Sequence, residues 1–257
     1  MGKLTERTAV VTGTGSLRGI GCAIARRLTS EGASVLLVDN CGAEDLRAAA
    51  ESCRAQTGVE GRIETLLIDL AEADAPERMI GHALELFGKV DLLVNNACFR
   101  NHQKFLDNTR SDFERTIAVN VAAPYFASQA VVPAMRRQGG GRIIHIASQL
   151  GVVAAPARSV YGLSKAALIN LTKSMALELA ADGIVVNAIS PGPVETQAMI
   201  ERFQRDPEGL RQRLAHLPAG RNGMPEEIAE LALFLATTPA TFLMGSNVMI
   251  DGGYTIH

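Results

Sequence analysis

A chain of 257 residues with 47% hydrophobic and 20% charged side chains is long enough for one large domain with a full core, and this balance excludes intrinsic disorder. The formal net charge of −2 gives no electrostatic basis for binding nucleic acid or an anionic membrane. No apolar run reaches the roughly 18 residues of a membrane span, and the N-terminus lacks the apolar region of a signal peptide, so we expect a cytoplasmic protein.

Short β-branched runs alternate with segments of helical periodicity along the whole chain. The runs are almost continuously apolar, as in Val35-Leu-Leu-Val38, which is typical of a parallel sheet covered on both faces. Strands are predicted at Thr8–Thr12, Ser34–Asp39, Ile63–Asp69, Asp91–Asn95, Arg142–Ala147, Val185–Ile189 and Asn247–Ile250, and helices at about 19–31, 43–57, 74–87, 111–137, 159–181 and 225–236. Right-handed crossovers then give a single doubly wound (Rossmann) α/β domain, residues 1–257, with a seven-stranded parallel sheet that binds ligands at its carboxyl edge.

A glycine-rich turn, Gly13 to Gly21, separates the first predicted strand from the first helix. Glycines let the backbone approach a pyrophosphate, and the helix N-terminus adds free N–H groups and a positive dipole end. Asp39 closes the second strand, where a carboxylate can accept hydrogen bonds from an adenosine ribose. A solvated loop carboxylate is the alternative role for Asp39, but together the two features predict a dinucleotide site.

Polar residues also follow the next three predicted strands. Asp69 ends the third, where an adenine would lie, Asn95-Asn96-Ala97 ends the fourth, and Ser148 closes the fifth. Each alone could be a turn or a cap, but jointly they ring one edge of the sheet. Asn120 lies inside a helical pattern, an unusual position given the poor helix propensity of asparagine.

Tyr161 and Lys165 are four residues apart in a helical segment, so both side chains leave the same helix face. An ammonium beside a phenol favours the phenolate, and we expect it to lower the tyrosine pKa from about 10 toward working pH. Such a tyrosine can exchange a proton with an alcohol or a carbonyl. The Tyr-x-x-x-Lys pattern by itself occurs by chance on many helices.

The motifs occur together in the order that one family shows. They are the glycine turn, Asn95-Asn96-Ala97, Asn120 in Val-Asn-Val, Ser148, Tyr161-x-x-x-Lys165, Val186-Asn-Ala-Ile-Ser-Pro-Gly192 and the closing Gly245 with Asp251-Gly-Gly253. Along essentially its whole length the chain resembles the short-chain dehydrogenases/reductases of the Tyr-x-x-x-Lys type.

The resemblance implies a role for each motif residue. Tyr161 is expected to be the catalytic acid/base, Ser148 to hydrogen-bond the substrate oxygen, and Lys165 to bind the nicotinamide ribose and lower the tyrosine pKa. Asn120 is expected to hold a water that connects the lysine to solvent. The cofactor site is expected at Gly13, Ser16, Gly19, Ile20, Asp39, Asp69, Leu70, Asn96, Ala97, Tyr161, Lys165, Pro191, Val194 and Thr196, with Val194 and Thr196 at the carboxamide. Residues 195–221 resemble the mobile loop that covers the substrate.

Three positions depart from the family pattern. Five residues, Thr14–Arg18, separate Gly13 from Gly19 where three are usual. That length resembles the enoyl-reductase branch of the family, whose tyrosine and lysine are, however, farther apart. Cys98 stands where glycine is usual, and His145 stands where asparagine is common and is predicted to be a hydrogen-bonded strand residue. The four cysteines contain no C-x-x-C pair and the five histidines have no ligand spacing, so no metal site is predicted.

The catalytic and cofactor residues that the resemblance implies predict an NAD(P)-dependent oxidoreductase that acts on CH–OH donors. NAD is preferred over NADP because Asp39 would repel a 2′-phosphate, although Arg18 beside Gly19 favours NADP. The predicted substrate site, Ser148, Gln149, Arg158 and Tyr161, has a rim more polar than a steroid or long-acyl pocket. We therefore expect a sugar, polyol or hydroxy acid, with Arg158 either a carboxylate partner or a structural arginine.

Two other functions and the assembly also follow from the sequence. The C-terminal half resembles fatty-acid ketoreductases, which favours a 3-oxoacyl-thioester reductase as the alternative enzyme. A catalytically silent NAD-binding regulator is the alternative of another class. Apolar residues on more than one face of segments 111–137 and 159–181, together with the resemblance, predict a homotetramer or homodimer; the residues are Val121, Phe126, Val131, Leu168, Leu171 and Leu179.

Overall fold

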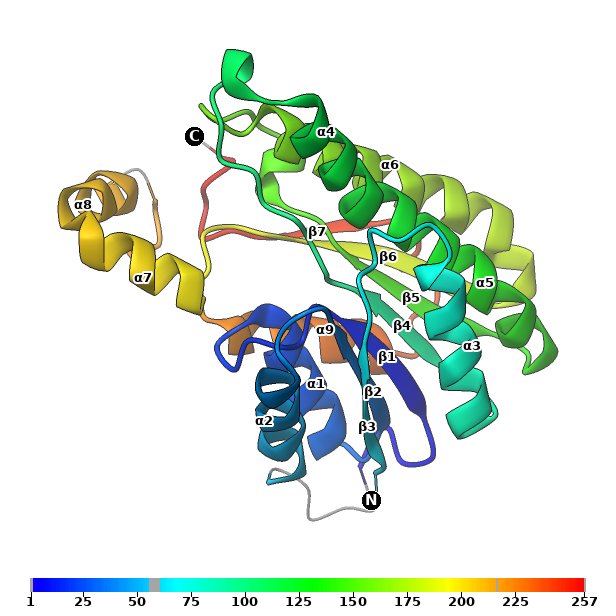
Figure 1. Ribbon diagram of the computed structural model, residues 1–257. Helices are drawn as coiled ribbons and strands as arrows, with labels where there is room; N and C mark the ends of the chain where they lie inside the picture. The colour runs from blue at the N-terminus through cyan, green and yellow to red at the C-terminus, as the bar shows by residue number, and fades with distance from the viewer. Residues whose placement is uncertain (1, 56–60, 216, 257) are drawn as a thin grey trace.

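Seven parallel strands form one sheet with helices on both of its faces (Figure 1). The computed structural model describes residues 2–55, 61–215 and 217–256. Within them the strand order is β3-β2-β1-β4-β5-β6-β7, and every neighbouring pair is parallel. The predicted doubly wound α/β fold is confirmed.

The strands and helices follow the predicted alternation closely. The strands are β1 (Thr8–Thr12), β2 (Ser34–Asp39), β3 (Ile63–Leu67), β4 (Leu92–Asn95), β5 (Gly141–Ile146), β6 (Ile184–Pro191) and β7 (Asn247–Ile250). The helices are α1 (Ile20–Ser30), α2 (Ala43–Arg54), α3 (Ala75–Phe87), α4 (Arg110–Ile117), α5 (Ala123–Arg137), α6 (Ser159–Leu179), α7 (Gln197–Arg205), α8 (Pro207–Ala215) and α9 (Pro225–Thr237). Residues 56 and 57 of the predicted helix 43–57 lie outside the described residues.

Two apolar layers hold the sheet between its helices. On one face α1, α2 and α9 pack around side chains such as Ile24 and Leu28. On the other face α3, α5 and α6 pack around Met79, Val131 and their neighbours. Because the central strands are covered on both sides, every residue of β1 is buried, which explains its continuous apolar sequence.

The chain reverses its winding direction beside β1, which pairs with β2 on one side and with β4 on the other. At such a switch point the loops after neighbouring strands diverge and leave a crevice at the carboxyl edge of the sheet. This crevice is where the predicted site residues gather.

A π-helical turn, Ala118–Ala122, interrupts the predicted helix 111–137 and separates α4 from α5. By length and composition alone, the helix Arg110–Arg137 is apolar enough to cross a membrane, although polar residues such as Asn120 keep its uninterrupted apolar runs well short of a span. Half of the most apolar window in this helix is nevertheless buried inside the protein, and α5 packs on α3 and on strands β4 to β6. It is a core helix of this fold.

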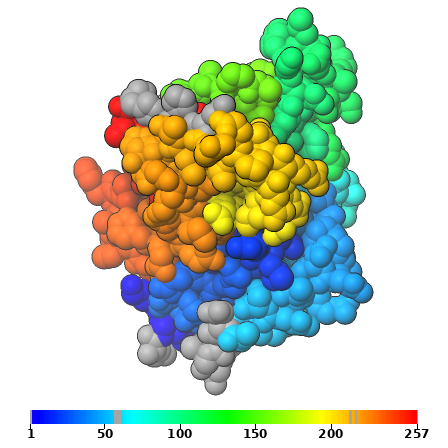
Figure 2. Space-filling model, turned by 90° about the vertical axis from the view of Figure 1, so that its left-hand side faces the viewer, coloured from blue at the N-terminus to red at the C-terminus, as the bar shows by residue number. Residues whose placement is uncertain are grey.

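Within the described residues, short helices and turns make up segment 195–221, which resembles the substrate-covering loop of the family. It contains α7 and α8, which extend from the rest of the molecule in Figure 1 and cover one face of it in Figure 2. The two prolines of this segment lie at helix boundaries: Pro207 begins α8, where a missing N–H costs nothing, and Pro218 follows the end of that helix. Phe203 anchors α7 by its burial.

Candidate active site

A cavity of about 610 Å³ opens at the carboxyl ends of the strands. Every predicted cofactor and substrate residue lines it, from Gly13 after β1 to Thr196 before α7. The sequence analysis could anticipate this convergence because the carboxyl ends of parallel strands meet at one edge of the sheet.

The glycine-rich turn lies between β1 and α1 and is locked to the loop after β4. Gly13 has a φ of +72°, and a side chain there would place its Cβ 2.7 Å from the amide nitrogen of Asn96. That nitrogen donates hydrogen bonds to the backbone oxygens of Thr12 (2.8 Å) and Gly13 (3.0 Å). Asn96 therefore holds the turn in place and is itself part of the cavity wall.

The first turn of α1 offers its backbone N–H groups to the cavity. No side chain caps Gly19, the first turn contains no acidic residue, and both Gly19 and Ile20 line the cavity wall. Uncapped N–H groups at the positive end of a helix dipole bind anions such as a pyrophosphate. This end of the cavity fits the phosphates of a dinucleotide.

The lengthened glycine turn contacts the end of β2 through Gly15. Gly15 donates its backbone N–H to the Asp39 carboxylate over 2.7 Å, and a Cβ on Gly15 would meet the Cys41 sulfur at 2.2 Å. The other carboxylate oxygen of Asp39 accepts the N–H groups of Asn40 and Cys41. Arg18, in the turn, is exposed and lies outside the cavity wall. Asp39, at the end of β2, lines the cavity.

Asp69 lies two residues beyond the end of β3, because β2 turns away after Asp39 and leaves β3 no partner there. Its carboxylate accepts hydrogen bonds from Arg115 (2.9 Å) and from the backbone of Ala71 (3.0 Å). Burial acts to raise the pKa of Asp69, but these bonds outweigh it and the pKa is lowered. Asp69 is therefore a paired, ionised carboxylate.

Ser148, Tyr161 and Lys165 meet on the opposite wall of the cavity. Ser148 follows β5, and its hydroxyl donates to the Gln149 side chain (3.0 Å) while accepting the N–H of Leu150 (3.1 Å). Tyr161 and Lys165 leave the same face of α6, and both are buried. The Lys165 ammonium donates to the Ile146 carbonyl (2.7 Å) and lies 5.8 Å from the centre of the Tyr161 ring.

The pKa of Tyr161 is raised to about 12, and the expected lowering is wrong for the described structure. Burial is the main cause, and the neighbouring Cys98 adds to it. Arg100, the Ser148 hydroxyl and Arg158 act in the opposite direction. Burial likewise lowers the pKa of Lys165, and its ammonium is held by a backbone carbonyl.

Asn120 is the one predicted site residue that does not line the cavity. It is fully buried in the π-helical turn, where its side chain accepts the N–H of Phe99 (2.7 Å) and donates to the Phe99 carbonyl and to Ser164. Ser164 in turn donates to the backbone oxygen of Tyr161 (2.7 Å). Asn120 thus ties the loop after β4 to α6, and its side chain does not face the cavity.

Pro191, Val194 and Thr196 form the wall beyond β6. The Thr196 hydroxyl is buried and has no hydrogen-bond partner within the described part of the chain. A buried hydroxyl without a partner on a cavity wall fits a polar group of a ligand, such as the predicted carboxamide.

His145 has the structural role that the sequence predicted. It is fully buried in β5, and its Nδ1 pairs with the Asn95 side chain at 3.2 Å. Burial, followed by the charge of Lys165, lowers its pKa to about 3, so the ring is neutral.

Cys98 and Arg115 line the cavity although the sequence analysis did not place them there. The sequence showed only that Cys98 replaces the usual glycine, because the residue type alone does not tell which way a side chain after β4 points. Its pKa is lowered, since the charges of Arg100 and Lys165 outweigh its burial. Arg115 could have been found only by pairing it with Asp69, 46 residues away.

Known oxidoreductases are similar to this chain over nearly its whole length. A family model described as enoyl-(acyl carrier protein) reductase matches residues 13–255. The oxidoreductase UcpA of Escherichia coli K12 is 38% identical and covers 100% of this chain and 97% of that protein. The 3-oxoacyl-[acyl-carrier-protein] reductase FabG of Thermotoga maritima is 32% identical, with coverage of 99% and 100%. The NAD-dependent glycerol dehydrogenase of Listeria innocua is 34% identical, with coverage of 98% and 95%.

A solved structure matches the fold over nearly the same length. It is a protein from Beutenbergia cavernae, identified only provisionally as an NAD(P)-dependent gluconate 5-dehydrogenase, with NADP bound at low occupancy. The TM-score is 0.90 at 33% identity, and the match covers 99% of this chain and 98% of that one.

Proposed function

Because the chain belongs to the short-chain dehydrogenase/reductase family, we propose that it transfers a hydride between NAD(H) and a secondary alcohol or ketone of a small polar substrate. One observation carries this proposal. Ser148, Tyr161 and Lys165 meet on the wall of the same cavity that receives the uncapped N-terminus of α1. A proton-transfer group beside a dinucleotide site is what this reaction needs.

The side chains divide the oxidation between them. The Ser148 hydroxyl hydrogen-bonds the substrate oxygen and holds it against the Tyr161 phenol. The phenolate takes the hydroxyl proton as the C–H electron pair leaves the carbon as a hydride. A nicotinamide bound on this wall supplies the hydride acceptor. Lys165 is positioned to hold the adjoining ribose, as the family resemblance implies.

Asp39 supports NAD over NADP as the cofactor. Its carboxylate stands where an adenosine ribose would bind, and a 2′-phosphate there would meet like charge. Arg18, the residue that argued for NADP, lies outside the cavity wall. Among the relatives, one is named NAD-dependent and one structure holds NADP, so the preference depends on this chain's own residues.

A polar substrate is supported by the residues around Ser148 and Tyr161. Gln149 is buried there and bonds the serine hydroxyl, and Arg158 and His102 line the same cavity. The glycerol dehydrogenase and the provisional gluconate dehydrogenase among the relatives favour a polyol, sugar or hydroxy acid. The relationship to FabG favours the second candidate, a 3-oxoacyl-thioester reductase.

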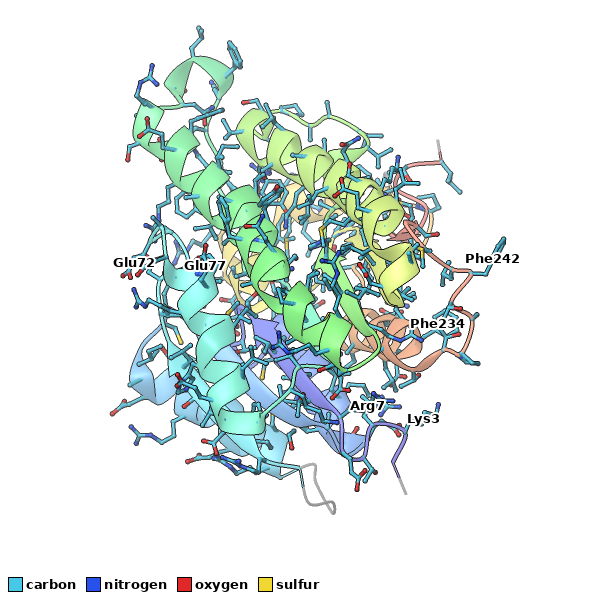
Figure 3. All side chains as sticks on the ribbon, turned by 90° about the vertical axis from the view of Figure 1, so that its right-hand side faces the viewer. Lys3, Arg7, Glu72, Glu77, Phe234 and Phe242 are labelled. Atoms are coloured by element: carbon cyan, nitrogen blue, oxygen red, sulfur yellow. The ribbon has the colours of Figure 1, made fainter. Side chains whose placement is uncertain are left out.

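Exposed apolar side chains support assembly into a homodimer or homotetramer. Of the six residues that suggested an interface from sequence, Val131, Leu168 and Leu179 are buried within the chain, Val121 and Leu171 are partly buried, and only Phe126 is exposed. The outer faces of α4, α5 and α6 instead expose Phe113, Tyr125, Leu163 and Leu177. In Figure 3, α6 runs beside the long helix that α4 and α5 form end to end, and Phe234 of α9 and Phe242 are two further exposed aromatic side chains.

A substrate panel tests the proposed function. Purified protein is mixed with NAD and with sugars, polyols, hydroxy acids or steroids, and with NADH and 3-oxoacyl thioesters, while NADH absorbance is followed. Turnover of small polar alcohols, lost in Tyr161→Phe, supports the proposal. A preference of ~10³-fold for steroids or 3-oxoacyl thioesters would refute a polar substrate, and a preference for the thioesters would indicate the 3-oxoacyl-thioester reductase. Cofactor binding without turnover of any compound would indicate the silent regulator.

A further inference from the structure

Three side chains from two segments of the chain meet on the cavity wall. Cys98 and Arg100 come from the loop after β4, and Tyr161 comes from the first turn of α6. The Arg100 guanidinium is hydrogen-bonded to the side chains of both Cys98 and Tyr161. It therefore bridges a thiol and the phenol to which the proposed function assigns the proton transfer.

The hydrogen bond between Arg100 and Tyr161 has a fixed direction. A guanidinium carries five N–H donors and no acceptor, and the hydroxyl is the only polar group of a tyrosine side chain, so the phenol oxygen accepts. A hydrogen bond from a cation stabilises a phenolate more than a neutral phenol. Burial, the largest effect, raises the pKa of Tyr161, and the charge of Arg100 acts against it.

Lys165, in contrast, is bound to the backbone. Its ammonium donates to a backbone carbonyl over 2.7 Å and lies 5.8 Å from the centre of the Tyr161 ring. After burial, the charges of Cys98 and Arg100 have the largest effects on the pKa of Tyr161, and Arg158 has a smaller effect in the same direction as Arg100. The remaining charged or titratable side chains on the described cavity wall are His102, Arg115, Arg202, Asp39 and Asp69.

Cys98 holds the Arg100 guanidinium and opposes its effect on the phenol. Burial raises the pKa of Cys98, but the charges of Arg100 and Lys165 outweigh it and the pKa is lowered, which favours the thiolate. The charge of Cys98 in turn raises the pKa of Arg100, so the guanidinium stays protonated. The same charge acts to raise the pKa of Tyr161. Neighbouring residues of one loop thus act on the phenol in opposite directions.

We propose that Arg100 is a catalytic residue of the proton transfer: its guanidinium, held by the Cys98 sulfur, donates to the Tyr161 oxygen and stabilises the phenolate that accepts the alcohol proton. This inference rests on the proposed function and adds a residue to the same step. Cys98 stands where the family usually has glycine, so the family pattern does not supply this pair.

Two substitutions should change alcohol oxidation in opposite directions. Arg100→Gln removes the cation from the phenol oxygen, so kcat/KM for the alcohol at pH 7 should fall about threefold to tenfold while KM for NAD stays within about threefold. Cys98→Ser removes the opposing charge and keeps an acceptor for the guanidinium, so kcat/KM should rise by a similar factor. Its rise with pH should also begin about one pH unit lower.

The control variants separate charge from packing. Arg100→Lys keeps the charge and should recover part of the activity that Arg100→Gln loses. Lys104→Gln removes a positive charge from the same loop at an exposed position outside the cavity wall, and it should change nothing. A thermal melt shows whether each variant is folded. Loss of packing would not produce the gain in activity expected of Cys98→Ser.

Alkylation of Cys98 tests its contact with Arg100 without any substrate. Iodoacetamide reacts with the thiolate, and mass spectrometry of the peptides distinguishes Cys98 from the other cysteines. Cys22 and Cys53 are fully buried, and burial raises the pKa of Cys41 to about 11. Arg100→Gln should raise the pH of half-maximal alkylation of Cys98 by about one unit.

The outcomes separate this inference from the proposed function. Wild-type turnover that Arg100→Gln changes by less than about twofold would overturn the catalytic role and leave the proposed function standing. Lower activity in both Arg100→Gln and Cys98→Ser, with no shift of the pH profile, would show that the pair only packs the cavity wall and would also overturn it. No turnover of any compound by the wild type would overturn the proposed function and the catalytic role together. The alkylation would then still show whether Arg100 holds the Cys98 thiolate.

Discussion

Replacing Asp39 with asparagine removes the charge that we expect to select NAD while keeping the shape of the side chain. The Asp39 carboxylate accepts three backbone N–H groups, those of Gly15, Asn40 and Cys41. An asparagine oxygen can still accept the N–H groups of Asn40 and Cys41. Asp39→Asn should therefore alter the electrostatics of the adenosine end more than its backbone.

The magnitude follows from Coulomb's law. A 2′-phosphate charge ~5 Å from the Asp39 carboxylate, at an effective dielectric constant of about 20, is opposed by about 3 kcal/mol. Asp39 is only partly buried, and solvent and salt screen part of this repulsion. We expect Asp39→Asn to raise the NADP/NAD ratio of kcat/KM by about tenfold to a hundredfold. The asparagine NH2 group would face the Gly15 N–H instead of accepting its hydrogen bond, so binding of both cofactors should weaken to a similar degree and the ratio should report the charge.

The assay measures kcat/KM for both cofactors with one substrate, in the wild type and in the variant. Glu44→Gln is the matched control, because Glu44 is an exposed carboxylate in the first turn of α2 and does not line the cavity. A ratio that changes by less than about threefold, or a wild-type protein that already favours NADP, would refute the reasoning. Equal loss with both cofactors would mean that Asp39 acts only through the glycine turn.

Three further predictions concern catalysis and assembly. Tyr161→Phe should lower kcat by at least ~10² while the dissociation constant for NAD stays within a few-fold. Lys165→Ala should impair both turnover and NAD binding. Near-native turnover of Tyr161→Phe would show the mechanism to be wrong. Because the pKa of Tyr161 is raised to about 12, phenolate is the minor form at neutral pH, so kcat/KM for alcohol oxidation should rise with pH from about 7 to 10 while ketone reduction, which needs the phenol, should not. Light scattering at micromolar concentration should give the mass of a dimer or tetramer, and Phe126→Glu should lower it; a wild-type monomer contradicts the assembly.

Local patterns were sufficient for most of the fold. Strands such as β1 and β2 are buried on both faces, so their continuous apolar runs are distinctive, and their predicted bounds were confirmed without change. The end of β3 was predicted two residues too late. Its apolar run continues through Ile68, but β2 turns away after Asp39 and offers no further partner, and a strand's own sequence does not contain that information.

The helices α7 and α8 and the π-helical turn required tertiary information. The charged residues and prolines of segment 195–221 are compatible with a loop or with a pair of short helices, and the burial of Phe203 fixes α7 against the protein. Asn120 was noticed as out of place in a helix, yet its bonds to Phe99, 21 residues away, explain the π-helical turn. A residue with poor helix propensity inside a helix therefore indicates a long-range contact, but the sequence does not identify the other residue.

The pKa of Tyr161 shows where reasoning from spacing alone fails. Lys165 one turn away suggested a lowered pKa, and the spacing was correct, since both side chains leave the same face of α6. The two effects compete, because a neighbouring cation favours the phenolate whereas burial disfavours any charge, and burial wins. The cations that do lower the phenol pKa are Arg100, which comes from the loop after β4, and Arg158, the N-cap of α6 three residues before Tyr161.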